Sequence, residues 1–205
     1  METCIIPVKN TSLQTIKCLL VIVIVVTLSA CTKNPYTPIN ADVKAKFNYQ
    51  PGTYWIYTDA ISGETDSFSV RTNTVQNSNV LTEAIFMYIT RYNLSAPNDT
   101  TLTRCMLSRN YVQTFALGAT VTYPFKPGPI ISGGYVLGVN SSYSVNGQTF
   151  ADIAEITRSI QYPIIQTDTF YMNADVGIIK IIEYQKIDTT VVNRVWELQR
   201  WNIVR

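Results

Sequence analysis

Short runs of apolar and aromatic residues, often alternating with polar ones, recur along the chain after residue 50. Turn-forming residues such as Ser62-Gly63, Asn98-Asp99 and Asn146-Gly147 separate these runs. Alternation with a period of two is typical of β-strands that have one buried face. The pattern predicts strands over residues 53–58, 66–75, 80–92, 100–107, 111–117, 135–143, 149–158, 169–184 and 191–204.

Short connections indicate how these strands pair. Strands joined by a tight turn run antiparallel, because a parallel return needs a crossover of about a dozen residues or more. Asn146-Gly147 is the clearest turn, since this dipeptide tolerates the positive φ angles of a type I′ hairpin. We therefore predict an all-β domain with a single antiparallel, strongly curved sheet of about nine strands, arranged as a half-barrel or barrel-like meander. A β-sandwich is the alternative.

The last expected strand changes phase part-way along. Strict alternation would place Trp196 and Trp201 on opposite faces of the sheet. One extra residue near positions 199–200 would turn both inward, together with Leu198 and Ile203. This predicts a β-bulge, which bends a strand as a curved sheet requires. If there is no bulge, both faces of the strand are partly covered.

Residues 123–135 contain three prolines and three glycines. Proline cannot donate to a strand ladder, so this segment is expected to be a long loop rather than a central strand. Most loops of this kind are connectors, and a lid that controls ligand access is the alternative.

The chain begins with a positively charged stretch and a short apolar run. Lys9 and Lys17 precede residues 18–30, which are mostly apolar and lead to Cys31. This arrangement is typical of an export signal. The run holds 13 residues, whereas a membrane-spanning helix needs about 20. An export signal is therefore preferred to a transmembrane anchor.

Leu28-Ser29-Ala30-Cys31 resembles the lipobox of bacterial lipoproteins, in which the cysteine is acylated and the signal removed. The resemblance implies a signal peptide over residues 1–30 and a lipid anchor, such as palmitate, on Cys31. Thr32 stands in place of aspartate, and no acidic cluster follows it. By resemblance to the sorting signals of bacterial lipoproteins, these features imply a periplasm-facing location on the outer membrane. Residues 31–50 are expected to form the lipidated N-terminus and a flexible tether, and residues 51–205 the all-β domain.

Composition limits the kinds of catalysis and binding that the protein can support. The chain has no histidine, which is the commonest general base and metal ligand. Removing Glu2, Lys9 and Lys17 from totals of 16 basic and 14 acidic residues leaves 14 and 13, a net charge of +1 that predicts no nucleic-acid partner. Cys105 is the one cysteine outside the signal and the anchor, and its apolar surroundings predict a core residue rather than a reactive thiol.

The sequence contains no hydrolase motif, phosphate loop, paired-cysteine zinc pattern or calcium loop. We therefore expect no enzymatic activity, no cofactor and no metal. A calcium site formed by Asp59, Glu64 and Asp66 around one turn is a minor alternative. An envelope hydrolase would require two carboxylates that folding alone brings together in a cleft.

Aromatic residues are the abundant side chains that could form a binding surface. Most are expected to fill the core, because each buries a large area. The alternative is an apolar groove in a half-open barrel, able to hold an acyl chain or another hydrophobic ligand. The residues expected to line this groove are Trp55, Tyr57, Phe86, Tyr88, Trp196 and Trp201.

Three motifs extend the resemblance beyond the lipobox. They are Gly52-x-Tyr54-Trp55-x-Tyr57, Val176-Gly177-x-x-Lys180 and Trp196-x-Leu198-x-x-Trp201. Together they are similar to motifs of small lipoproteins common in Bacteroidetes. That resemblance implies a curved all-β domain like the half-barrels of periplasmic lipoprotein carriers and receptors, and it brings no catalytic residues. Asp99-Thr100-Thr101 and Asp188-Thr189-Thr190 resemble the O-glycosylation pattern of that phylum, which makes Thr100 and Thr189 candidate modification sites.

The sequence therefore predicts a membrane-anchored envelope lipoprotein that acts as a non-enzymatic binding or interaction module. An apolar ligand or an outer-membrane protein is the expected partner. The alternative function is a structural or assembly accessory of an outer-membrane complex, and an envelope hydrolase is the least favoured.

Overall fold

The computed structural model describes residues 36–77, 82–93, 100–115, 118–131, 133–160, 165–187 and 190–205. Residues 1–35, with the expected signal and Cys31, lie outside this part of the chain, as does Thr189. The described residues form one helix, α2 (Ala41–Phe47), and twelve strands. The strands are β1 (Tyr54–Asp59), β2 (Thr65–Asn77), β3 (Glu83–Asn93), β4 (Thr100–Ser108), β5 (Tyr111–Gln113), β6 (Thr120–Thr122), β7 (Gly128–Ile130), β8 (Gly134–Val145), β9 (Gln148–Ile160), β10 (Ile165–Asn173), β11 (Gly177–Ile187) and β12 (Thr190–Asn202).

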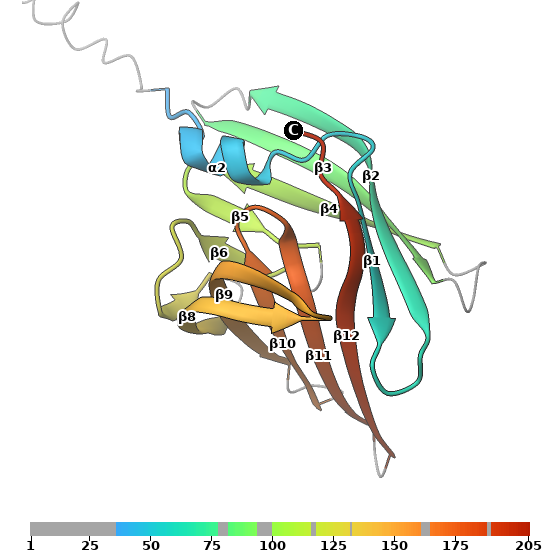
Figure 1. Ribbon diagram of the computed structural model, residues 1–205. Coiled ribbons are helices and arrows are strands. Elements are labelled where there is room, and N and C mark those ends of the chain that lie inside the picture. Colours follow the sequence, from blue (N-terminus) through green and yellow to red (C-terminus); the bar gives the residue numbers. More distant parts are fainter. Residues whose placement is uncertain are drawn as a thin grey trace, which may run out of the picture. The chain divides into compact units, whose positions relative to one another are not determined.

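All these strands belong to one antiparallel sheet, in the order β6-β5-β4-β3-β2-β1-β12-β11-β10-β9-β8-β7. The sheet curls into a nearly closed barrel (Figure 1), and its two edges, β6 and β7, follow each other in the chain. The all-β class and the single curved antiparallel sheet are confirmed, with twelve strands in place of about nine.

The extra strands have simple local causes. β6 and β7 are three-residue strands in segments for which no strand was predicted. The run predicted over residues 169–184 is divided into β10 and β11 by a tight turn. The side-chain oxygen of Asn173 accepts hydrogen bonds from the backbone N–H groups of Asp175 and Val176, which stabilises this turn.

The predicted bulge in the last strand is present. Ile56 of β1 pairs with Arg200 of β12, but the next residue, Tyr57, pairs with Leu198, so Gln199 is the extra residue. The bulge brings Trp201 opposite Trp55, and Trp201 packs against the core while Gln199 is exposed. The prediction that Trp196 and Trp201 turn to the same face is therefore confirmed.

The predicted hairpin at Asn146-Gly147 is also confirmed, with φ angles of 49° and 75° at the two central residues. The hairpin of β8 and β9 folds back against neighbouring strands. Tyr143 stacks on Tyr171 of β10 with ring centroids 4.5 Å apart, and the Asn146 side chain donates to the Leu198 carbonyl of β12. The hairpin tip thus covers the sheet near β10 and β12.

The flexible tether expected over residues 31–50 is wrong for residues 36–50, because these residues belong to the folded domain. Val43 and Phe47 of α2 are fully buried, and the Phe47 ring meets the Tyr123 ring edge-on at 5.2 Å. Lys44 pairs with Glu83 at the start of β3. Helix α2 lies at one end of the barrel (Figure 1), where it shields apolar side chains from water.

Two aromatic side chains of β1 bond to backbone carbonyls at the beginning of β11, two strands away in the sheet. The Trp55 indole N–H donates to the Val176 carbonyl at 2.6 Å, and the Tyr57 hydroxyl donates to the Ile178 carbonyl at 2.7 Å. Both rings are fully buried. Since buried donors need partners, these bonds fix β1 relative to the first residues of β11.

Gly177 has no room for a side chain where Trp55 approaches the beginning of β11. Its φ angle is +98°, and an added Cβ would lie 3.2 Å from the Tyr49 hydroxyl and 3.4 Å from the Trp55 indole nitrogen. We expect Gly177→Ala to lower the free energy of unfolding by about 1–3 kcal/mol, measured by urea denaturation. The matched control is Gly138→Ala, where an added Cβ meets no atom within 4 Å. Equal stability of the two variants would contradict this account of Gly177.

Candidate functional site

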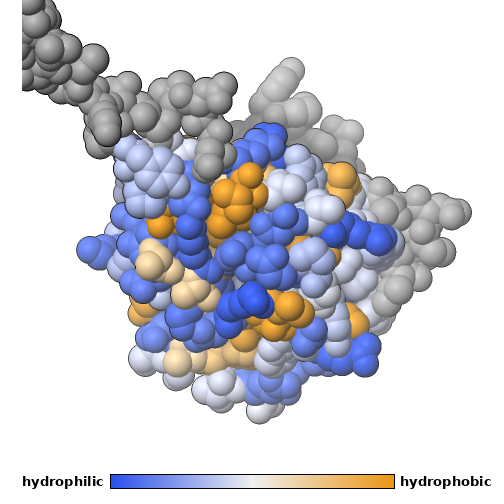
Figure 2. Space-filling model, turned by 90° about the horizontal axis from the view of Figure 1, so that it is seen from above, coloured by the Kyte–Doolittle hydropathy of each residue, from blue (hydrophilic) through white to orange (hydrophobic). Residues whose placement is uncertain are grey.

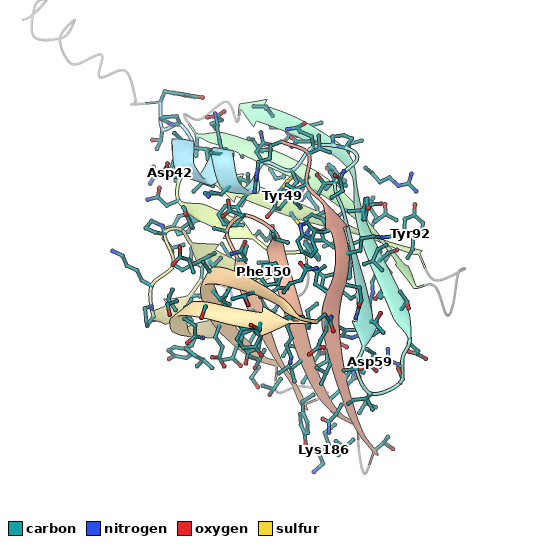
Figure 3. The ribbon with its side chains drawn as sticks, viewed as in Figure 1. Asp42, Tyr49, Asp59, Tyr92, Phe150 and Lys186 are labelled. Carbon is teal, nitrogen blue, oxygen red and sulfur yellow. The ribbon has the colours of Figure 1, made fainter. Side chains whose placement is uncertain are left out.

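Two cavities lie at opposite ends of the strands. Cavity 1, of about 190 Å³, lies where β3 and β11 end and where β10 begins. Cavity 2, of about 580 Å³, lies beside α2, where β10 ends and β11 begins. Figure 3 shows the two ends: Tyr49 is labelled near α2, and Asp59 at the far end of β1.

Cavity 1 combines aromatic walls with charged and hydroxyl groups. Its aromatic rings come from β1, β2, β12 and the segment after β5. The lining residues are Tyr57, Phe68, Phe115 and Trp196, with Asp66, Arg91, Thr101, Thr103, Gln166, Ile181 and Glu183. Phe115 contacts Phe68 with ring centroids 4.9 Å apart, so the aromatic floor of the cavity is continuous with the core.

Asp66 and Arg91 form a pair on one wall of cavity 1. The Arg91 Nε donates to Asp66 Oδ2 at 2.6 Å, and the guanidinium also lies over the Phe68 ring at 5.6 Å. Burial raises the pKa of Asp66 although the positive charge of Arg91 opposes this. Arg91 therefore compensates the charge of Asp66.

Among the described residues, no cation forms a salt bridge with Glu183 or Asp168. Glu183 accepts a hydrogen bond from the Trp196 indole at 2.9 Å, and Asp168 accepts one from the Gln166 amide at 2.8 Å. The two acids are direct partners in the β10–β11 ladder, so their side chains project to the same face. Asp168 is 2% exposed and its Oδ1 atom has no hydrogen-bond partner.

The environment of Asp168 disfavours its ionised form. Burial, and then the negative charge of Glu183, raise the pKa of Asp168 to about 6, although the bond from Gln166 and the charge of Arg158 act the other way. Perturbed carboxyl groups of this kind are concentrated at functional sites.

Cavity 2 has mainly apolar walls. Its apolar lining residues are Tyr123, Pro124, Phe125, Val139, Phe150, Ala151, Ala174, Val176 and Trp201, and its polar ones are Lys46, Gln148, Thr149, Asp152, Asn173 and Asp175. Phe150 and Trp201 are in contact, with ring centroids 5.5 Å apart (Phe150 is labelled in Figure 3). Viewed from the α2 end, the surface is mostly hydrophilic with small separate apolar patches (Figure 2).

The structure does not bring the six residues of the predicted apolar groove together. Trp55 is part of the buried core, and Tyr57 and Trp196 line cavity 1. Phe86 and Tyr88 alternate with the buried residues Ile85, Met87 and Ile89, so they face away from the interior. Trp201 lines cavity 2. A single groove is therefore replaced by two cavities of different chemistry.

The minor alternative of a calcium site is not supported by the positions of its three acids. Asp59 accepts hydrogen bonds from the Val195 backbone and from Ser62, and these outweigh burial and lower its pKa. Glu64 pairs with Arg194, and Asp66 with Arg91. Within the described ranges, no group of three or more potential ligands could hold a metal ion.

Other predicted residues have clear positions. Cys105 is 1% exposed and burial raises its pKa to about 12, which confirms it as a core residue. Thr100 is the first residue of β4, and its glycosylation stays a prediction, as does that of Thr189. In the part of the chain that the structure covers, we find no helix with the length and apolar character needed to cross a bilayer.

Sequence reasoning missed Glu183 as a cavity residue, and Asp168 as the buried acid beside it. One signal was available: Asp168 has the same strand parity as the buried Phe170 and Met172, which places a carboxylate on an apolar face. The Asp168–Glu183 pair is the arrangement that an acid hydrolase would need, but the free Oδ1 of Asp168 is itself buried. The site can present negative charge beside aromatic rings.

Comparisons of the chain with protein-family models, curated protein sequences and solved structures found no match.

Asp168 gives a prediction about pH. Because its pKa of about 6 exceeds the ordinary value of ~3.9, the folded state binds more protons than the unfolded state between these values, and ionisation destabilises the fold as pH rises. We expect Asp168→Asn to stabilise the protein at pH 8 by about 1–3 kcal/mol and to have little effect at pH 4.

The measurement is urea unfolding of both proteins across this pH range. Asp42→Asn, which removes an exposed carboxylate from α2, is the control and should show no comparable gain at pH 8. A constant difference between Asp168→Asn and the parent protein at every pH would contradict the assignment.

Proposed function

We propose that this protein is a lipid-anchored envelope protein whose β domain is a non-enzymatic binding module for a ligand with a substantial apolar part. Cavity 2 is the observation that carries the proposal. Its volume of about 580 Å³ falls within the ~300–1,000 Å³ typical of pockets for organic ligands. Its apolar walls with a few polar groups also match the usual lining of such pockets.

Different residues of cavity 2 would make different contributions to ligand binding. Phe150 and Trp201 offer aromatic surface, and Phe125 extends it from the segment between β6 and β7. Lys46 and Asp175 form an ion pair at the rim, which leaves their charges compensated. An apolar body would lose contact with water against the rings, at a gain of about 25 cal/mol per Å² buried.

The membrane anchor is the second part of the proposal. It depends on the lipobox resemblance of Leu28-Ser29-Ala30-Cys31, which lies outside the described residues. Acyl chains on Cys31 would place the domain, and with it cavity 2, at a bilayer surface. The proposed location is the periplasmic face of the outer membrane.

A second candidate function, an assembly accessory of an outer-membrane complex, is favoured by one surface feature. Ile131, Tyr135, Leu137 and Val139 are exposed apolar residues on and just before β8. Apolar residues grouped on a surface are typical of sites where proteins bind one another. Crosslinking in cells followed by purification would recover a defined outer-membrane partner if this function is correct, and only the monomer if it is not.

Cavity 2 can be tested with a neutral apolar dye, N-phenyl-1-naphthylamine, added to the full-length lipoprotein in phospholipid nanodiscs. We expect Trp201→Ala to weaken dye binding by about tenfold, because it removes one aromatic wall of the cavity. Fluorescence titration measures the affinity, with empty nanodiscs as background.

Tyr135→Ala is the matched control, since Tyr135 is an exposed aromatic residue that lines neither cavity. It should bind the dye like the parent protein. Trp201→Phe separates folding from binding, because it keeps a ring and should retain part of the affinity. Unchanged dye binding by a folded Trp201→Ala protein would reject cavity 2 as the site.

The anchor has its own test. We expect Cys31→Ser to abolish incorporation of radiolabelled palmitate and to release the protein from the outer-membrane fraction, because serine lacks the thiol that is acylated. The matched control is Cys105→Ser, which changes a cysteine of the folded domain and should leave labelling intact. Labelling of the Cys31→Ser protein would reject the lipoprotein assignment.

A further inference from the structure

Glu183 lines cavity 1, and the buried acid Asp168 lies next to it on the same face of the sheet. Asp168 and Glu183 are direct partners in the β10–β11 ladder, an arrangement that is destabilising for like charges. Asp168 is 2% exposed, and its Oδ1 atom has no hydrogen-bond partner. An unpartnered buried oxygen costs free energy, so its presence calls for a physical explanation.

The cations near this pair have other partners or lie on neighbouring strands. Arg91 bonds to Asp66, and Arg194, the β12 partner of Glu183, pairs with Glu64 at 3.7 Å and lies over the Trp196 ring. Arg158 is the β9 partner of Asp168, and its charge lowers the pKa of that acid, yet the pKa stays raised. Among the described residues, Glu183 is therefore the acid of the cavity wall that forms no salt bridge, whereas Asp66 pairs with Arg91.

The shape of cavity 1 restricts the ligand. Its volume of about 190 Å³ corresponds to roughly six water molecules at ~30 Å³ each, and it is smaller than the ~300 Å³ at the lower end of common ligand pockets. Tyr57, Phe115 and Ile181 provide an apolar wall beside Glu183. Thr101, Thr103 and Gln166 add neutral polar groups.

We propose that cavity 1 is a second binding site, specific for a small organic cation: an ammonium group that lies against Glu183 beside Asp168, carried on a compact apolar body that packs against the aromatic wall. The ammonium would compensate the two adjacent carboxylates, and its N–H groups would donate to carboxylate oxygens. The aromatic rings favour a cation further, since their faces carry negative potential. This site is separate from cavity 2 and does not depend on the function proposed for it.

Other ligands fit cavity 1 less well. An anion would be repelled by Glu183 and Asp66. The one described cationic residue on the cavity wall, Arg91, already pairs with Asp66. Among the described residues, the acids of the cavity do not form a group that could hold a metal ion. A purely apolar ligand would bury the Glu183 carboxylate without a compensating charge, which is unfavourable.

The test compares three molecules of nearly the same shape: phenethylammonium, 2-phenylethanol and phenylacetate. Isothermal titration calorimetry with the full-length lipoprotein in phosphatidylcholine nanodiscs measures their affinities at pH 7.5. We expect phenethylammonium to bind at least tenfold more tightly than 2-phenylethanol, and phenylacetate to bind more weakly than either.

Two variants locate the interaction. Glu183→Gln should reduce phenethylammonium binding at least tenfold while leaving 2-phenylethanol binding within about twofold, because only the charge is lost. Glu155→Gln removes a carboxylate that bonds to Tyr171 and lines neither cavity, and it should change neither affinity. Equal affinity for the ammonium and the alcohol, tighter binding of phenylacetate, or no binding by the folded protein would overturn the proposal. Dye binding in cavity 2 is unaffected by any of these outcomes.

Discussion

The position of β1 is the constraint on which the rest of the structure depends. β1 pairs with β2 on one side and with β12 on the other, so it joins the beginning and the end of the domain in one sheet. Its two inward aromatic residues, Trp55 and Tyr57, also donate hydrogen bonds to carbonyls at the start of β11. These bonds form across a long sequence separation and add to the β1–β12 ladder that joins the two halves of the meander.

These contacts bring three short motifs of the sequence together in the fold. Trp55 and Tyr57 belong to the first motif, and the carbonyls of Val176 and Ile178 belong to the second. The third motif supplies Trp201, which the bulge at Gln199 places opposite Trp55. The motifs therefore describe one structural joint, and their residues are largely occupied with the fold.

Alternation and turn residues were sufficient to predict the class, the meander, the hairpin at Asn146-Gly147 and the bulge. They failed where a short element depends on distant contacts. Helix α2 has only seven residues and is stable because Val43 and Phe47 are buried against the barrel, which no local pattern reveals. The turn after Asn173 was hidden because strongly β-forming residues surround it on both sides.

The cavities were less predictable than the fold for a related reason. Along β3 both parities are apolar, so sequence alone could not decide that Ile85 and Met87 face inward and Phe86 outward. The Asp168–Glu183 pair depends on the register of β10 with β11, which can be predicted only when the turn between these strands has been located. Composition therefore indicated an abundance of aromatic side chains, but neither their division between two cavities nor the acids beside one of them.

The early start of the folded domain changes how far it can move from a bilayer. The described domain begins at Tyr36, and five residues from position 31 would span at most about 18 Å if fully extended. If Cys31 is acylated as proposed, this length would keep the first residue of the described domain within about 18 Å of the anchored residue, so the domain could not move far from the bilayer.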